Sequence, residues 1–250
     1  MPPFACAEYR STDRKGMTMD TAIQEKTSPG FPRLNQPAPA FEAETTHGVL
    51  RLEDFQGSWV ILFSHPADFT PVCTTEFIAF AELAPELKKR GVELCGLSID
   101  STYSHIAWVR NIEKNFGVKI PFPIIADLNK EVATLYGMVM PGESKTETSR
   151  CVFVIDPKGI LRAMIYYPLT TGRNMHEILR LIDALQTTDK HGVATPANWK
   201  PGDKVIVPPP RTTEDAEERM KAGYETPDWY FSKKSLEVSS PGSERTAKKI

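Results

Sequence analysis

The chain has 250 residues, of which 40% are hydrophobic, and a formal net charge of −2. This length suits one large domain with appendages or two small domains, and it is ample for a hydrophobic core. The near-neutral charge gives no sign of a nucleic-acid or membrane partner, and no apolar run approaches the roughly 20 residues needed to span a bilayer. We therefore expect no nucleic-acid partner and no membrane partner.

Residues 1–30 are polar and lack periodicity, so we predict a disordered N-terminal leader. It contains no apolar segment of the kind that a secretory signal requires. The four cysteines (Cys6, Cys73, Cys95 and Cys151) form no CxxC pair, and their spacing does not suit zinc. We predict reduced thiols, a cytoplasmic protein and no bound metal.

Short apolar runs mark the strands. Buried strands are predicted at 59–63, 92–99, 123–126 and 151–155, and 160–166 returns as a hairpin partner after the turn at 156–159. Cys95 and Cys151 fall inside these strands, which favours a packing role for both.

Helical periodicity separates the strands. The first helix carries Phe77, Phe80, Ala84 and Leu87 on one face. Pro85 is expected to kink or restart this helix, and Gly91 to close it. Further helices are predicted at 101–116 (with Ile106, Val109 and Ile112 near one face), at 129–136, and through Met175, Ile178, Ile182 and Leu185.

The order of elements predicts an α/β protein with a thioredoxin-like fold, in which a mixed central sheet has helices on both faces. We place this domain at 31–187. Prolines and tryptophans then cluster in a C-terminal arm (188–235) with one short polar helix near 213–222, and 236–250 is predicted to be disordered. The arm is too thin to hold its own core, so it packs either on a partner subunit, at a dimer interface, or on its own domain.

Cys73 follows a buried strand and lies at the start of a helix. The first turn of a helix presents free backbone N–H groups and the positive end of the helix dipole, and both stabilise a thiolate. The thiolate is the nucleophilic form of cysteine. Position alone leaves two readings equally open, a reactive cysteine and a buried structural one.

The residues before Cys73 form a motif, Pro66-x-x-x-Thr70-x-x-Cys73 within SHPADFTPVCTTEF, that resembles the active-site loop of peroxiredoxins. The segments LCGLSIDS, PFPIIAD, SRCVFVIDPKG, YYPLTTGRN and VATPANW also resemble the one-cysteine peroxiredoxins of the AhpC/TSA family, and the bacterial and archaeal thioredoxin-peroxidase-like members most of all. The resemblance covers nearly the whole chain outside its predicted disordered ends.

The resemblance implies a thiol-specific peroxidase that reduces hydrogen peroxide and organic hydroperoxides without a metal or an organic cofactor. Cys73 would attack the peroxide and become a sulfenic acid. Thr70 and Arg150 would bind the substrate, Arg150 stabilising the charge that develops as the O–O bond breaks. Pro66 would stiffen the loop and shield the thiolate from water.

The resemblance also assigns supporting roles. Glu76 would hold two arginines in place, with Arg173 as the second of them. His65 would steady the thiolate or satisfy a buried backbone group. Without the resemblance, Glu76, Arg150 and Arg173 would be interpreted as ordinary surface charges.

No cysteine follows Cys151, and Thr226 and Ser232 stand where the archaeal relatives carry arm cysteines. We therefore predict a one-cysteine mechanism with an external thiol reductant, such as thioredoxin or glutathione, in a homodimer or a decamer built of dimers. A hydrolase using a Cys73–His65 pair, and a peroxide sensor or holdase chaperone using the same cysteine, are the alternatives.

Overall fold

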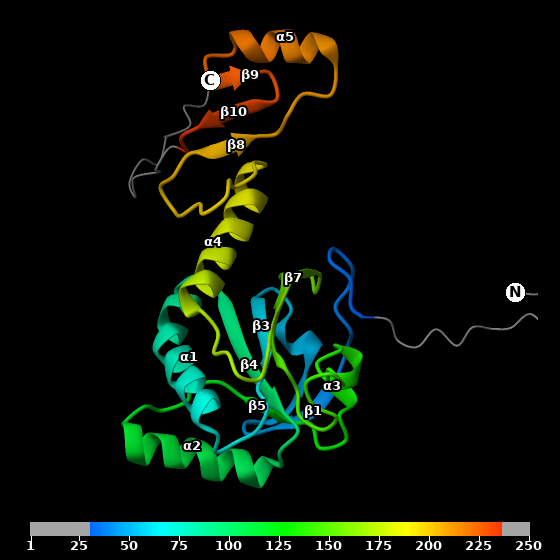
Figure 1. Cartoon of the computed structure of the whole chain (residues 1–250), viewed down its shortest axis with the longest axis vertical. Coiled ribbons are helices and arrows are strands. Elements are labelled where there is room, and N and C mark those ends of the chain that lie inside the picture. Colours follow the sequence, from blue (N-terminus) through cyan, green and yellow to red (C-terminus); the bar gives the residue numbers. More distant parts are fainter. Residues whose placement is uncertain (1–30, 237–250) are drawn as a thin grey trace, which may run out of the picture. The chain divides into compact units, whose positions relative to one another are not determined.

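The computed structural model describes residues 31–236; the predictions for the leader, for Cys6 and for 237–250 lie outside them. A seven-stranded sheet has the order β2-β1-β5-β4-β3-β6-β7 (Figure 1). Its strands are β1 (Glu42–Thr45), β2 (Gly48–Arg51), β3 (Trp59–Ser64), β4 (Val92–Ser98), β5 (Ile124–Ala126), β6 (Arg150–Ile155) and β7 (Leu161–Tyr167). The helices of this region are the 3-10 helix η1 (Leu52–Phe55), α1 (Pro71–Lys89), α2 (Thr102–Phe116), α3 (Glu131–Leu135) and α4 (Met175–His191).

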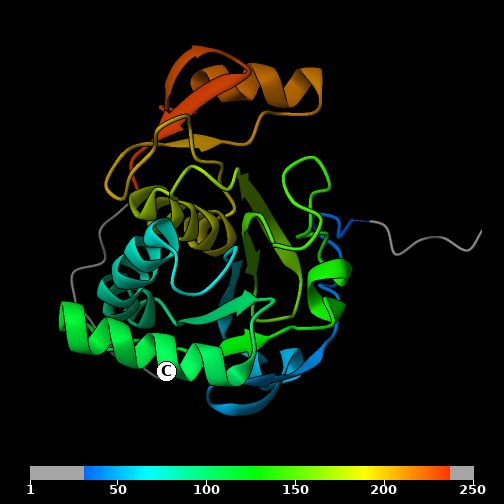
Figure 2. The same cartoon turned by 60° about the horizontal axis from the view of Figure 1, so that its bottom comes forward.

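The alternation of side chains along β3 builds two cores, one on each face of the sheet. Ile61 and Phe63 face the core that α1, α2 and α4 cover, whereas Val60 and Leu62 face the core that α3 covers. Figure 2 shows the sheet between these helices. The expected mixed sheet with helices on both faces is therefore confirmed.

Strand direction decides which loops meet. β3, β4 and β5 are mutually parallel, and β6 is antiparallel to β3. The loops that follow β3 and β4 therefore lie at the same edge of the sheet as the first residue of β6. That residue is Arg150, and the loop after β3 leads directly into α1.

Two helix predictions need correction. α1 runs without interruption through Pro85, so the predicted restart there is wrong. In α2 the buried residues are His105, Trp108 and Ile112, while Ile106 is exposed. The predicted face shares Ile112 with the observed one. At its other two positions, His105 and Trp108 are buried in place of the predicted Ile106 and Val109.

The first two strands escaped prediction. β1 and β2 form an antiparallel hairpin around His47, and β1 pairs with β5 at a single register position, Thr45 opposite Ile125. Their sequence, EAETTHGVLR, has few large apolar residues. The hairpin is held by its pairing with β5 and by Ala43 and Leu50, which pack on the core that α3 covers.

The arm contains more regular structure than we predicted. A three-stranded sheet of order β8-β10-β9 joins β8 (Val205–Val207), β9 (Glu225–Asp228) and β10 (Phe231–Lys234), with α5 (Thr213–Lys221) between β8 and β9. Trp199 and Val205 are buried in a small cluster with Ala184 of α4 and Val193. The proposed limits of the domains remain predictions.

None of the helices described in residues 31–236 is long and apolar enough to cross a bilayer.

Candidate active site

Cys73 is the third residue of α1 and is fully buried. Thr70 precedes the helix in an extended conformation, and Pro71 occupies its first position, where a missing N–H costs nothing. The turn between β3 and α1 places Phe69 at a positive φ of 56°, which is uncommon for a residue with a side chain. This tight turn brings the start of α1 over the end of β3.

Three charged side chains form a connected set, which we call the guanidinium cluster, that contacts the sulfur through Arg150: Glu76, Arg150 and Arg173. Arg150 Nη1 lies 3.3 Å from Cys73 Sγ and 2.7 Å from Glu76 Oε2. Arg173 donates to both carboxylate oxygens of Glu76, at 2.8 and 2.7 Å. Two guanidinium groups thus share one carboxylate, and the excess positive charge lies beside the sulfur.

The backbone fixes both arginines. Arg150 shares the α1 face of β6 with Val152 and Val154, since alternate residues of a strand point the same way. Its Nε and Nη2 also donate to the carbonyl of Leu169, at 2.9 and 2.8 Å. Arg173 Nη1 donates to the carbonyls of Ser64 and Cys151. These fixed bonds hold the guanidinium charge in place before any substrate arrives.

Burial raises the pKa of Glu76, but the charge and hydrogen bonds of Arg173, together with the charge of Arg150, outweigh it and hold this pKa below its usual value. Glu76 is only 3% exposed, so its carboxylate depends on these partners. Arg173 also lies over the rings of Phe63 and Phe80, at 5.1 and 5.2 Å from their centroids.

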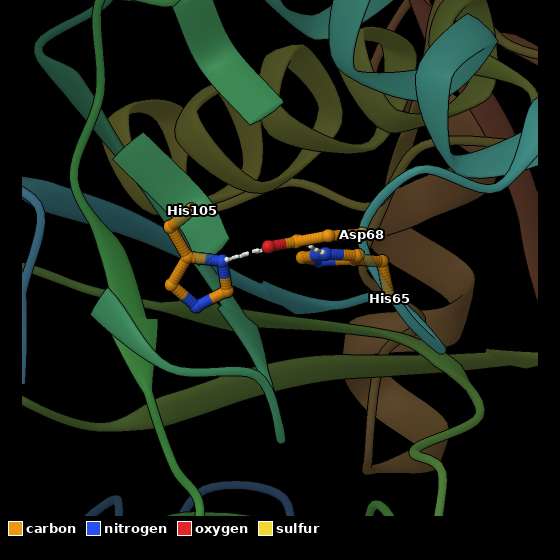
Figure 3. Close-up of side chains that lie close together, drawn as sticks. All are labelled: His65, Asp68 and His105. Atoms are coloured by element: carbon orange, nitrogen blue, oxygen red, sulfur yellow. Dashed lines mark hydrogen bonds and ion pairs between the residues drawn. The ribbon is translucent and has the colours of Figure 1, made fainter. Parts of the chain in front are cut away.

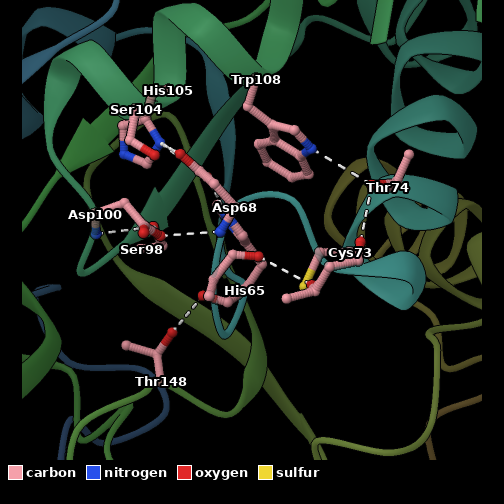
Figure 4. A network of polar contacts seen from close by, with 12 residues as sticks. His65, Asp68, Cys73, Thr74, Ser98, Asp100, Ser104, His105, Trp108 and Thr148 are labelled. Carbon is pink, nitrogen blue, oxygen red and sulfur yellow. Dashed lines mark hydrogen bonds and ion pairs between the residues drawn. The ribbon is translucent and has the colours of Figure 1, made fainter. Parts of the chain in front are cut away.

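A second buried group, which we call the imidazole cluster, consists of His65, Asp68 and His105 (Figure 3). Asp68 Oδ1 lies 3.0 Å from His65 Nε2, and Asp68 Oδ2 lies 2.9 Å from His105 Nδ1. The other ring nitrogen of His105 lies 3.1 Å from the carbonyl of Ile125. Asp68 also has its backbone N–H bonded to Asp100, which accepts from Ser98 (Figure 4).

Burial and proton sharing set the charges of this cluster. Burial raises the pKa of Asp68, but the hydrogen bonds from His105 and His65 outweigh it and lower this pKa to about 2. Burial lowers the pKa of His65, against the opposing effect of Asp68. His65 is therefore neutral at pH 7, and its Nδ1 has no hydrogen-bond partner among the described residues.

The imidazole cluster is also the set of described side chains with the composition and spacing of a metal site, since its ligand atoms lie within 4.8 Å of one another. His105 would suit a metal, because its far nitrogen already bonds a carbonyl. His65 would not, because a metal on Nε2 requires a proton on Nδ1, and no acceptor faces that atom. The ring nitrogens lie 2.9–3.0 Å from the carboxylate oxygens, which are hydrogen-bond distances. The cluster is therefore held together by protons between these atoms.

The remaining predicted residues lie on the loop before α1. The Thr70 hydroxyl donates to the carbonyl of Ala67 at 3.0 Å, and Pro66 is buried. Neither the Thr70 hydroxyl nor a ring nitrogen of His65 makes a hydrogen bond to the sulfur in the structure, so Arg150 is the side chain that does.

Sequence reasoning missed Asp68 and His105. Asp68 lies inside the recognised motif, but at one of its variable positions. Trp108 and Ile112 follow His105 by three and seven residues, a spacing that marks one buried face of a helix. Counting Trp108 as apolar would have placed His105 inside the protein.

The side chains of the other two described cysteines belong to the core on the opposite face of the sheet from Cys73. Cys95 and Cys151 are fully buried and not in a disulfide, as the strand pattern predicted. Burial raises the pKa of both thiols, that of Cys151 to about 12. In the arm, Thr226 Oγ1 lies 3.0 Å from Ser232 Oγ.

Two family descriptions match successive parts of the chain. Residues 34–164 match the AhpC/TSA family, and residues 184–223 match the C-terminal domain of one-cysteine peroxiredoxins. A peroxiredoxin of Aquifex aeolicus is 63% identical over 217 residues, covering 82% of this chain and 98% of that protein. A peroxiredoxin of the archaeon Nanoarchaeum equitans is 53% identical over 220 residues, covering 82% and 99%.

Solved structures of peroxiredoxins are also similar to this chain. A yeast mitochondrial one-cysteine peroxiredoxin, described with a thiol-resolving mechanism via glutathione and thioredoxin systems, is 45% identical with a TM-score of 0.72, covering 82% of this chain and 99% of its own. A cysteine-to-serine mutant of peroxiredoxin 6 from Arenicola marina is 41% identical with a TM-score of 0.74, at the same coverage.

Proposed function

Because the chain belongs to the AhpC/TSA family of peroxiredoxins and is a thiol-dependent peroxidase, we propose that its activity resides in Cys73. The observation that carries this assignment is the 3.3 Å contact between Arg150 Nη1 and Cys73 Sγ at the start of α1. A guanidinium and a helix N-terminus both favour the thiolate, which is the form that attacks a peroxide. Cys95 and Cys151 are buried thiols of raised pKa, and in Cys151 burial outweighs the opposing charge of Arg173.

The reaction transfers one oxygen to the sulfur. The Cys73 thiolate attacks the terminal oxygen of the hydroperoxide, the one that carries the hydrogen. The S–O bond forms as the O–O bond breaks, and an alkoxide or hydroxide leaves. The leaving oxygen takes up a proton and departs as alcohol or water, and Cys73 becomes a sulfenic acid. Arg150 stabilises the negative charge as it moves from the sulfur to the leaving oxygen.

The loop residues orient the substrate. Since the Thr70 hydroxyl already donates its proton to Ala67, its oxygen is free to accept a hydrogen bond from the peroxide O–H. Pro66 keeps the loop rigid and dry, and Glu76 and Arg173 hold Arg150 against the sulfur. To His65, whose Nδ1 has no hydrogen-bond partner among the described residues, we assign the role of proton acceptor for the Cys73 thiol.

Access requires a local opening. Cys73 has no exposed surface, whereas Thr70 beside it is half-buried and Phe69 is 56% exposed. The peroxide and the reductant therefore reach the sulfur when the loop before α1, or the first turn of α1, moves.

The sulfenic acid is reduced by an external thiol, with thioredoxin and glutathione as the candidates. The described part of the chain offers no resolving cysteine, because Cys95 and Cys151 are buried and the arm carries Thr226 and Ser232. The free state of the described cysteines suits the cytoplasm. The exposed aromatic side chains Trp229 and Tyr230 suit burial against a second copy in a homodimer, or in a decamer of such dimers.

The test is peroxide turnover by the wild-type protein and by Cys73→Ser, with thioredoxin and with glutathione, using hydrogen peroxide and an organic hydroperoxide. We expect turnover in the wild type and none in Cys73→Ser. Turnover also separates an enzyme from a sensor or a holdase, neither of which consumes peroxide repeatedly.

Intact-mass measurement after one equivalent of peroxide tests the one-cysteine mechanism. We expect one added oxygen at Cys73. Rapid loss of two thiols to a disulfide would refute an external reductant.

A further inference from the structure

His105 has an acceptor at each ring nitrogen. Its Nε2 lies 3.1 Å from the carbonyl oxygen of Ile125, and its Nδ1 lies 3.0 and 2.9 Å from the two oxygens of Asp68. A carbonyl and an ionised carboxylate can only accept hydrogen bonds, so both nitrogens of His105 carry protons. His105 is thus the donor in both contacts, and it is fully buried and paired with the Asp68 carboxylate.

The same carboxylate determines the tautomer of His65. Asp68 accepts at His65 Nε2, at 3.0 Å, so the proton of the neutral ring is on Nε2 and Nδ1 keeps its lone pair. The Nδ1 atom is buried and has no partner among residues 31–236. A buried acceptor without a donor is costly, and such an atom in a native site calls for a functional explanation.

The ring of His65 lies against the helix that carries the reactive sulfur. Its centroid is 4.7 Å from that of Phe77, which stands one turn after Cys73 on α1. It stacks on Trp108 at 5.0 Å, and the Trp108 indole donates to Thr74, the neighbour of Cys73. Figure 4 shows Trp108, Thr74 and Cys73 together with the three side chains of the imidazole cluster.

We propose that Asp68 and His105 are positioning residues of the peroxidase: together they hold His65 in its Nε2–H tautomer, so that the Nδ1 lone pair is available to the Cys73 site. His105 keeps Asp68 ionised and oriented, and Asp68 fixes the proton of His65. This inference rests on the proposed role of Cys73. It assigns no contact with the peroxide to Asp68 or His105.

Asp68→Asn is the direct test, because asparagine has almost the same shape but presents an N–H group as well as an oxygen. With its oxygen held by His105, the amide N–H faces His65 Nε2, which must then become the acceptor, and the proton moves to Nδ1. We expect nitrogen-15 NMR of histidine-labelled, reduced protein to show Nδ1 of His65 without a proton in the wild type and with one in Asp68→Asn. The His65 signals are assigned by their absence in His65→Gln.

The second readout is the rate constant for oxidation of Cys73 by hydrogen peroxide, measured by stopped-flow fluorescence. We expect Asp68→Asn to lower it by about tenfold or more, within the range of a lost proton acceptor. Asp100→Asn is the matched control: it removes a carboxylate of the same network that bonds Ser98 and the Asp68 backbone but no histidine. It should leave the tautomer of His65 as in the wild type.

His105→Gln keeps the test informative if Asp68→Asn fails to fold. Its amide still donates to Asp68, so His65 should keep the Nε2–H tautomer while the rate falls less than in Asp68→Asn. A proton on Nδ1 of wild-type His65, an unchanged tautomer in folded Asp68→Asn, or a changed tautomer with an unchanged rate would overturn the proposal. Peroxide turnover by Cys73→Ser would instead overturn the assignment of Cys73, so the two failures are distinguishable.

Discussion

The guanidinium cluster contacts Cys73 at the start of α1, and the imidazole cluster packs against the same helix through His65 and Phe77, yet the two work by different means. In the guanidinium cluster two permanently charged side chains share the carboxylate of Glu76, so its field hardly changes with pH. In the imidazole cluster two histidines share the carboxylate of Asp68, and its charges depend on where protons lie. The first supplies fixed charge to the sulfur, and the second controls a single proton position.

Breaking the guanidinium cluster at its shared carboxylate should have the largest effect. Glu76→Gln leaves two buried guanidinium groups without their counter-charge, and we expect a loss of about 3–5 kcal/mol in the free energy of unfolding, measured in urea. Glu86→Gln, on the same helix but in an exposed ion pair with Lys89, is the control and should cost far less. Equal losses in the two variants would show that the cluster is not held by this pairing.

Arg150→Lys tests the fixed charge at the sulfur itself. Lysine cannot reach Glu76, Cys73 and the Leu169 carbonyl at once, as the guanidinium does. We expect the rate constant for Cys73 oxidation to fall by about 10²–10³-fold, as when one donor to a developing oxyanion is removed. Arg162→Lys is the control. It alters an ion pair between β7 and Asp189 of α4 that belongs to neither cluster, and it should leave the rate constant unchanged.

The imidazole cluster should reveal itself through pH. Burial lowers the pKa of His65 in the folded protein. As the pH falls below about 6.5, the unfolded chain therefore binds a proton at His65, whereas the native protein does not. The stability that neutral His65 contributes is therefore complete above that pH and is lost as the pH falls toward the folded-state pKa.

We expect the free energy of unfolding to fall by up to about 1.4 kcal/mol per pH unit in this window, measured by urea denaturation at a series of pH values. His65→Gln should flatten the dependence, whereas His176→Gln, at an exposed histidine, should not. Ordinary aspartates titrate near pH 4 and below. A free energy of unfolding of the wild type that is constant between pH 6.5 and about 4 would contradict this role of His65.

The smallest effect is expected on the opposite face of the sheet. Cys95 belongs to the core that α3 covers and has no part in either cluster. Cys95→Ala should change the rate constant of Cys73 oxidation by less than about twofold, since local interactions of this kind do not extend across a packed sheet. A larger change, or a second oxidised cysteine in the wild-type mass spectrum, would argue against a one-cysteine mechanism.

Much of the fold was readable because its signals are local. The continuous apolar run at 59–63, the turn at 156–159 and the period of α4 each specify an element without long-range information. β1, β2, β9 and β10 were missed because few of their residues are large and apolar, and β8 because its apolar run is only three residues long. Pro85 was misjudged because it lies in the last turns of a helix that tertiary packing holds together.

The sequence by itself determined the class of protein and pointed to the sulfur that we propose as reactive: Cys73 lies at a strand-to-helix turn, within a motif that few families share, and this local pattern specifies its immediate environment. Only the tertiary structure decided which distant groups meet it. Arg150 reaches Cys73 because β6 runs antiparallel to β3, and His105 reaches Asp68 because α2 buries the face with Trp108. Strand direction arises from packing over the whole sheet, so no local pattern reveals it, and the periodicity of α2 marks a buried face without telling which groups that face meets.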